Sequence, residues 1–150
     1  MNTIKNNNTI KRNDLILIHD SARVLFDIND VNKLIYNLPK LKAITLASKS
    51  TETLKTVKND KNIFKKVINT LDRNIVYNIK TPQGFNFNLL FNAYSNFYKD
   101  KNKNKIIITD DIMIIEKYTK LSPYVLETNK VNIKITTKED LKLIKNLINI

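Results

Sequence analysis

The chain has 150 residues, of which 42% are hydrophobic, which is enough apolar material for the core of one domain but not of two. Its 26 Lys and Arg residues against 14 Asp and Glu give a formal net charge of +12, so an anionic partner has to be considered first. The absence of cysteine excludes disulfides, thiol nucleophiles and zinc–thiolate sites, and the single glycine excludes a glycine-rich phosphate loop.

Residues 1–13 are polar, rich in asparagine and without periodicity, which predicts a disordered N-terminal tail. They contain no hydrophobic signal core, and no later apolar stretch reaches the roughly 18 residues that a membrane-spanning helix needs. We therefore expect a soluble, cytoplasmic protein with one domain over residues 14–150.

A run of four aliphatic residues, Leu15 to Ile18, predicts a strand buried on both faces of a parallel sheet. Polar residues follow at once and place His19, Asp20 and Arg23 at the carboxyl end of this strand. In open α/β sheets ligands bind at that edge.

The next helix is predicted over residues 27–38, because its apolar residues follow helical spacing and Pro39 is expected to break it. A second buried strand is expected within residues 41–48. The stretch from residue 50 to about 80 alternates β-branched and polar residues around the turn signal "KNDKN". It predicts an extended β-arm or hairpin of the kind that often packs on a partner subunit.

Helical spacing of aromatic residues predicts a core-facing helix from Phe87 onward, and a further helix is expected with Thr109 as its N-cap. The stretch "VNIKITTKEDL" reads as a strand that carries Lys134 outward and then enters a helix capped by Thr137 and Asp140. In that last helix the apolar residues expected to face inward are Leu141, Ile144, Leu147 and Ile148. The alternation of strands and helices predicts an α/β fold with a mostly parallel sheet.

Six short motifs occur in a specific order along the chain. They are "HDSAR" (19–23), "ETLK" (52–55), "TLDR" (70–73), "TPQGF" (81–85), "TDD" (109–111) and "NIKITTKEDL" (132–141). Together they resemble the C-terminal two-thirds of the 2-C-methyl-D-erythritol 4-phosphate cytidylyltransferase family. The resemblance covers nearly the whole chain from about Leu15 to its end.

The resemblance implies an enzyme that joins CTP to methylerythritol phosphate and releases pyrophosphate, with Mg²⁺ as cofactor, in the non-mevalonate route to isoprenoids. It also implies a Rossmann-like nucleotidyltransferase fold. Carried over to this sequence, Asp20 would be a catalytic residue and metal ligand, Arg23 would bind the substrate, and Lys134 would be a catalytic residue in contact with the acceptor phosphate.

The resemblance further implies a homodimer in which the arm of each subunit completes the site of the other. On the arm, Arg73 would act as a catalytic residue and Thr53 as a substrate-binding residue, both reaching across the dimer to the acceptor. Thr81 and Thr109 would line the same substrate pocket.

Physical chemistry favours cations in such a site, because an acceptor phosphate is already an anion and needs alignment and charge neutralisation rather than a general base. Each residue also has a structural interpretation. Lys134 could protect an edge strand, Asp20 could cap the following helix, and His19 could simply pack. Arg73 could pair with a surface carboxylate, and Thr81 could be a turn residue before proline.

Family members begin with a strand and a glycine-rich, basic turn that holds the CTP triphosphate, and we expect this chain to lack that segment. The expected fold is therefore a truncated one, which is inactive alone unless a separate N-terminal fragment supplies the missing half. Smaller departures are Val24, where a proline is usual, Glu52, where an aspartate is usual, and Lys80, where a glutamine is often seen.

Two other functions remain open from the sequence. Ribitol 5-phosphate cytidylyltransferases share "HDS", "TPQ" and "NIKIT"-like motifs, although "TLDR" and "ETLK" favour the methylerythritol acceptor. A small basic nucleic-acid-binding domain would use the net positive charge, but the lysines are spread along the chain and no recognition signature occurs, so nucleic acid is not the expected partner.

Overall fold

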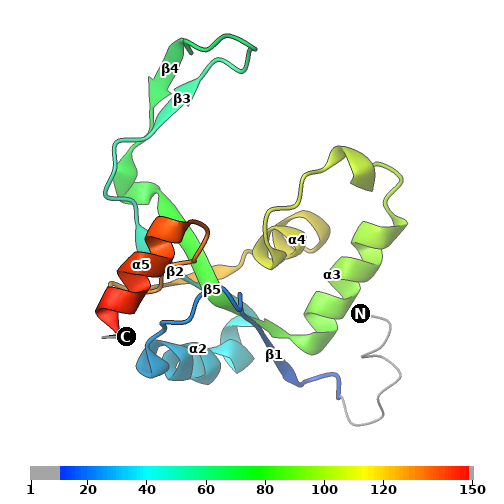
Figure 1. Cartoon of the computed structure of the whole chain (residues 1–150). Coiled ribbons are helices and arrows are strands. Elements are labelled where there is room, and N and C mark those ends of the chain that lie inside the picture. Colours follow the sequence, from blue (N-terminus) through cyan, green and yellow to red (C-terminus); the bar gives the residue numbers. More distant parts are fainter. Residues whose placement is uncertain (1–10, 149–150) are drawn as a thin grey trace.

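The computed structural model describes residues 11–148 (Figure 1). Its elements are β1 (Leu15–Ile18), α2 (Ile28–Leu41), β2 (Ala43–Lys49), β3 (Lys55–Val57), β4 (Val67–Thr70), β5 (Tyr77–Asn86), α3 (Phe87–Lys99), α4 (Asp111–Tyr118), β6 (Tyr124–Glu127) and α5 (Lys138–Leu147), with short 3₁₀ turns at Arg73–Ile75 and Lys103–Lys105. The tail expected at residues 1–13 lies mostly outside the described residues. Its last part forms a turn, in which Lys11 N–H donates to Asp14 Oδ2.

The main sheet has the strand order β1-β5-β2-β6. Strand β5 runs antiparallel to both β1 and β2, and only the β2–β6 pair is parallel. The expected α/β class is confirmed, but the expectation of a mostly parallel sheet is wrong, because the sheet is mixed. The reason is the connection between β2 and β5, which is a hairpin arm rather than the helical crossover that parallel neighbours require.

Helices cover both faces of the sheet, α2 on one side and α3 with α4 on the other (Figure 1). The residues of β2 alternate between the two cores, since Ala43 packs toward α3 and α4 whereas Ile44 packs toward α2. Gly84 of β5 allows the close approach of α2, because a Cβ atom there would lie 2.5 Å from Leu34 Cδ2. The only glycine of the chain is thus used for helix–sheet packing.

Strand β1 is at an edge of the main sheet and is not buried on both faces. Leu15 and Leu17 are 36% and 39% exposed, whereas Ile16 and Ile18 pack against the core under α3 and α4. The expectation of a doubly buried strand was wrong because an aliphatic run does not tell whether both faces of a strand are covered.

Helix α2 continues past the proline that was expected to end it. Pro39 lies in the last turn, and the helix closes when the Lys42 N–H donates to Leu38 O at 2.8 Å. Lys42 itself has the left-handed conformation typical of a helix end, with φ at 65°. The N-cap of α2 is Asp27, whose side chain accepts from two backbone N–H groups, so the helix-capping interpretation of Asp20 is wrong.

The caps of the later helices agree only in part with the sequence. The capping box of Thr137 and Asp140 at α5 is confirmed, but α4 is capped by Asp110 rather than by Thr109. Residues 131–136 form no strand, so Lys134 is not an edge-strand residue. For the inward face of α5 the expectation is confirmed at Ile144, which is buried, but is wrong at Leu141, Leu147 and Ile148, which are 42%, 48% and 39% exposed.

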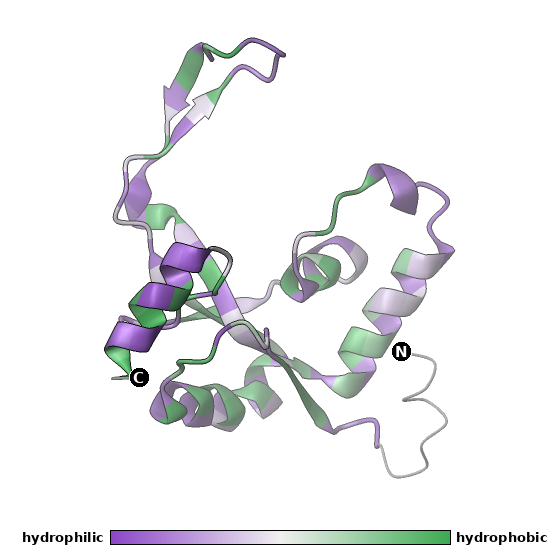
Figure 2. Cartoon of the chain, in the orientation of Figure 1, coloured by the Kyte–Doolittle hydropathy of each residue, from purple (hydrophilic) through white to green (hydrophobic). Residues whose placement is uncertain are grey.

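The arm is confirmed as an antiparallel hairpin of β3 and β4 that projects away from the body of the molecule (Figure 1). All of its strand residues are exposed, and Ile63 and Phe64 at its tip are more than 90% exposed. Hydrophobic residues are visible along the arm and on α5 in Figure 2. Within the described residues, none of the helices has the length and apolar character that crossing a membrane requires.

Candidate functional site

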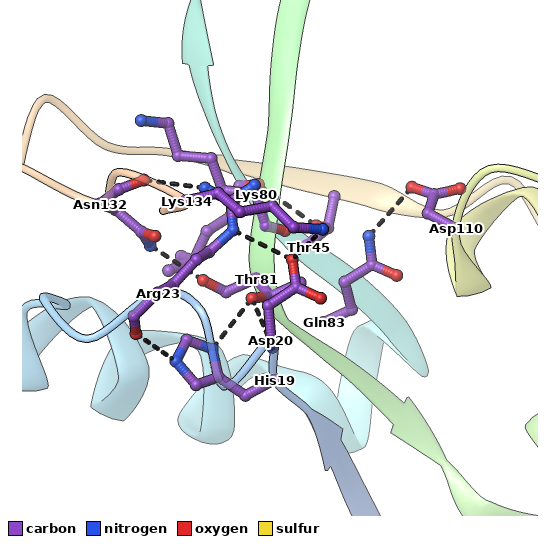
Figure 3. Close-up of polar contacts among 11 residues, drawn as sticks. His19, Asp20, Arg23, Thr45, Lys80, Thr81, Gln83, Asp110, Asn132 and Lys134 are labelled. Carbon is purple, nitrogen blue, oxygen red and sulfur yellow. Dashed lines mark hydrogen bonds and ion pairs between the residues drawn. The ribbon is translucent and has the colours of Figure 1, made fainter. Parts of the chain in front are cut away.

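Three charged side chains meet where β1 ends. Lys134 Nζ lies 3.1 Å from Asp20 Oδ2, and Arg23 Nε donates to the same oxygen at 3.3 Å (Figure 3). Their exposure decreases from Lys134 (47%) to Asp20 (35%) to Arg23 (13%). Two cations therefore share one carboxylate, and the more exposed cation is the lysine.

The loop of residues 19–23 is held against β5 by Thr81. The Asp20 N–H donates to Thr81 Oγ1 at 3.0 Å, and His19 Nδ1 lies 3.0 Å from the same hydroxyl. Because a carbonyl oxygen can only accept, His19 Nε2–H donates to Arg23 O at 3.0 Å, and in the neutral imidazole Nδ1 then accepts from the Thr81 hydroxyl. The packing expected for His19 is confirmed by its edge-on contact with the Phe26 ring, and its two hydrogen bonds join the loop to β5.

The segment that carries Lys134 is fixed by single contacts rather than by a strand ladder. Asn132 Nδ2 donates to Thr81 O at 2.9 Å, and Arg23 Nη1 donates to Asn132 O at 2.8 Å (Figure 3). The Ile135 N–H donates to Ala22 O at 2.9 Å. These contacts join the segment both to β5 and to the loop after β1.

The electrostatics of the cluster favour an ionised carboxylate. Partial burial alone would raise the pKa of Asp20, but the hydrogen bonds and charges of Lys134 and Arg23 outweigh it and hold that pKa below its usual value. For Lys80, by contrast, the charged form is disfavoured. Burial, reinforced by the positive charge of Arg23, lowers the pKa of Lys80.

A cavity of about 370 Å³ is lined by Asp20, Arg23, Lys80, Thr81 and Lys134 at one end. Its other end includes Thr109 and the two aspartates at the start of α4, Asp110 and Asp111. At that end the buried Gln83 donates to Asp110 Oδ2 at 3.0 Å and accepts from the Ile112 N–H at 3.2 Å. Asp111 accepts a hydrogen bond from the Tyr94 hydroxyl. The cavity therefore has a cationic end and an acidic wall, the second anchored by Gln83.

Five of the residues selected from the sequence come together in this cavity, although they lie up to 114 positions apart: Asp20, Arg23, Thr81, Thr109 and Lys134. The other two, Thr53 and Arg73, are exposed on the arm and do not line it. Arg73 Nη1 donates to Thr51 O at 3.5 Å, within the arm itself. The roles expected for all seven remain predictions.

The sequence did not indicate the parts played by Asn132, Gln83 and Lys80. Asn132 and Gln83 lie inside motifs, but an amide flanked by apolar residues gives no sign of which backbone groups it will meet. Lys80 was noted only as a departure from a usual glutamine. Its position in the cavity depends on β5, whose long antiparallel pairing with β2 is a tertiary feature.

A metal ion would find few protein ligands here. Within the described residues, no group of three or more His, Cys, Asp or Glu side chains is placed to hold one. Mg²⁺ is, however, often held by one or two carboxylates together with substrate phosphates and water. Asp20 fits such a site as a single carboxylate ligand beside an anionic substrate.

Comparison with known proteins gives one consistent result. The family model described as 2-C-methyl-D-erythritol 4-phosphate cytidylyltransferase matches residues 2–149. The protein of that name from Lachnoclostridium phytofermentans is 39% identical over 134 residues, which cover 89% of this chain and 54% of the relative. The chloroplastic protein of the same name from Oryza sativa is 35% identical over 91% of this chain and 43% of its own length.

Solved structures agree with these matches. The 4-diphosphocytidyl-2C-methyl-D-erythritol synthase of Anaerococcus prevotii superimposes with a TM-score of 0.79 at 31% identity, over 91% of this chain and 57% of the other. The 2-C-methyl-D-erythritol 4-phosphate cytidylyltransferase of Francisella tularensis gives a TM-score of 0.79 at 29% identity, over 96% and 64%. The chain thus spans about half the length of the relatives it matches.

Proposed function

Because the chain belongs to the 2-C-methyl-D-erythritol 4-phosphate cytidylyltransferase family, we propose that its cavity binds the sugar-phosphate acceptor of a reaction that transfers CMP from CTP and releases pyrophosphate. The acceptor on this proposal is 2-C-methyl-D-erythritol 4-phosphate. The observation that carries the proposal is the cluster of Lys134, Arg23 and Asp20 at the cationic end of the cavity.

The reaction requires the protein to align the two phosphate groups and to neutralise their negative charge. An oxygen of the acceptor phosphate forms a bond to the α-phosphorus of CTP, and the bond from that phosphorus to the pyrophosphate oxygen breaks. A phosphate monoester with a second pKa of about 6 is a dianion at neutral pH, so its attack requires no proton transfer to a base. Fixed cations offset the negative charge of the two phosphates as they approach.

Each side chain has a distinct part in this proposal. Lys134 is half-exposed and contacts the acceptor phosphate directly, while the more buried Arg23 holds Asp20 and supports the positive potential of the cavity. Thr81 and Thr109 line the cavity in which the acceptor is placed. Bound Mg²⁺, held by Asp20 and by phosphate oxygens, would supply additional positive charge.

Titration calorimetry with the two candidate acceptors tests the proposal. Methylerythritol phosphate is expected to bind more tightly than ribitol 5-phosphate, and Lys134→Met should weaken its binding about tenfold or more, as expected for loss of a charged contact to phosphate. Lys99→Met removes an exposed lysine from α3 and should have no effect. Equal binding by wild type and K134M, or tighter binding of ribitol 5-phosphate, would contradict the assignment.

The arm has a part in the same proposal, as the element through which two copies associate. Thr53 and Arg73 of one copy then enter the cavity of the other. If so, K134M and Arg73→Met chains bind the acceptor weakly when each is alone but regain part of the binding when mixed, because a mixed dimer contains one intact site. Mixtures that bind no better than the separate chains would show that each site is built from one chain.

A further inference from the structure

The segment from Thr128 to Thr137 is the least regular part of the site, although it carries Lys134. Its residues 131–136 belong to no helix or strand. At its start the Thr128 N–H donates to Ala47 O at 2.8 Å, and the Thr128 hydroxyl donates to the buried carboxylate of Asp30. At its end the capping box of α5 begins. Between these anchors the path of the chain depends on the contacts of Asn132 and Ile135.

Asn132 is the most deeply buried residue of this stretch, with 3% of its surface exposed. Its side chain binds β5 through the hydrogen bond from Nδ2 to Thr81 O, and its backbone oxygen accepts from the guanidinium of Arg23 (Figure 3). A single residue therefore joins the Lys134 segment to the central strand and to the second cation of the cluster.

The side-chain oxygen of Asn132 shows that packing alone does not explain this residue. Oδ1 is buried and, within the described part of the chain, has no hydrogen-bond partner. An unpaired buried acceptor costs about 1–3 kcal/mol, and an apolar side chain of similar size would avoid that cost. Turning the amide around does not help, because it would place Oδ1 against Thr81 O. The amide is needed because its Nδ2 group donates the hydrogen bond to Thr81 O.

From these contacts we infer that Asn132 is a positioning residue for the acceptor-phosphate site: it fixes Lys134 and the Arg23 guanidinium in the arrangement in which both face Asp20. The ligand named here rests on the proposed function, whereas the positioning itself rests on the contacts of Asn132. Lys134 follows Asn132 by only two residues, about 7 Å of extended chain, so a shift of the Asn132 anchor also shifts the backbone that carries Lys134.

The test compares Asn132→Ala with Asn129→Ala, which removes an exposed asparagine from the same segment. Ethyl phosphate serves as a probe of the cationic end that does not depend on the identity of the sugar. N132A is expected to weaken ethyl phosphate binding roughly tenfold, and N129A to leave it unchanged. Binding by N132A equal to that of N129A would overturn the inference.

A double-mutant cycle with Lys134→Met separates positioning from a general loss of stability. Because Asn132 is inferred to act through Lys134 as well as Arg23, the combined loss of ethyl phosphate binding in N132A/K134M should be clearly smaller than the sum of the two single losses. Independent roles would give fully additive losses, and that result would also overturn the inference.

Two further measurements cover the remaining outcomes. If N132A does not fold, Asn132→Ser, which retains a small polar side chain, replaces it in the same cycle. Hydrogen exchange at the Ile135 amide needs no ligand and should be faster in the Asn132 variant than in N129A; unchanged exchange counts against the inference.

A protein that binds ethyl phosphate but not methylerythritol phosphate refutes the proposed function and leaves the positioning role to be decided by the double-mutant cycle.

Discussion

Lys134 and Lys80 line the same cavity but differ in what surrounds their charges. Lys134 has Asp20 at 3.1 Å, whereas the ammonium of Lys80 makes no ion pair or hydrogen bond within residues 11–148. Lys80 is also half-buried and close enough to Arg23 for their repulsion to be felt. The lowered pKa means that the fold disfavours the charged form of Lys80, a situation that is often found at binding sites.

Replacement of Lys80 by methionine is therefore expected to raise the melting temperature at pH 7. Because the folded-state pKa of Lys80 is lowered, the folded protein disfavours its protonated form, and this cost is present at neutral pH and disappears only as the pH rises through that pKa. Thermal melts of K80M and of the exposed-lysine control K99M measure the effect. A lower melting temperature for K80M than for K99M would contradict this explanation.

Gly84→Ala should lower the stability of the fold. The added methyl group meets Leu34 Cδ2 at 2.5 Å and Leu38 Cδ2 at 3.0 Å, so α2 has to move away from β5. Overpacking of this kind costs about 1–3 kcal/mol, which urea unfolding can resolve. Asn92→Ala, on an exposed position of α3, is the matched control and should unfold at nearly the wild-type urea concentration.

The elements of the chain differ in how much of their stability is local. Helix α5 has a full capping box, and Ile144 is its one buried residue, so its stability depends on local capping together with the packing of a single side chain. The hairpin of β3 and β4 is almost entirely exposed and has little contact with the sheet. By contrast β5 pairs with two neighbours and supplies the backbone and side-chain groups that hold the site.

Asp140→Ala is expected to lower the melting temperature at neutral pH and to matter less in acid. Hydrogen bonds from the backbone and hydroxyl of Thr136 and from the backbone of Thr137 lower the pKa of Asp140 to about 2, from an ordinary value of 3.8. The stabilisation is complete above the ordinary value and is lost as the pH falls from 3.8 to about 2. Melting curves over this pH range, with Glu139→Ala as control, give the comparison; a difference independent of pH would exclude the charge as its source.

At the scale of the whole molecule, the net charge of +12 and the cavity are separate features. Within the cavity, cations and carboxylates occur together, so the selectivity that we propose for it depends on their arrangement and not on an excess of lysine. The remaining basic residues are spread along the sequence, so we expect from them only a general attraction to polyanions.

Binding to nucleic acid should accordingly be weak and non-specific. Duplex and single-stranded DNA are expected to bind at low salt and to dissociate near an ionic strength of about 0.15 M, with heparin behaving in the same way. Fluorescence anisotropy over a range of salt concentrations measures this. Tight binding of one nucleic acid at physiological salt, with heparin unable to compete, would instead favour a nucleic-acid-binding function.

The sequence by itself determined the family, the arm, the positions of most elements and the capping box of α5. It also selected the five residues that meet in the cavity. These features depend on the chemistry of neighbouring residues or on motifs whose order can be read directly from the sequence. Turn residues, helix caps and hydrophobic periodicity act over a few positions, so a single chain contains all the information that they need.

Only the tertiary structure decided that β5 lies antiparallel between β1 and β2, that residues 131–136 are not a strand, and that Asn132 joins Lys134 to Thr81. The physical reason is that each of these depends on which distant group satisfies a backbone or side-chain hydrogen bond. Thr81 and Asn132 are 51 positions apart, and nothing in the neighbourhood of either residue specifies the other.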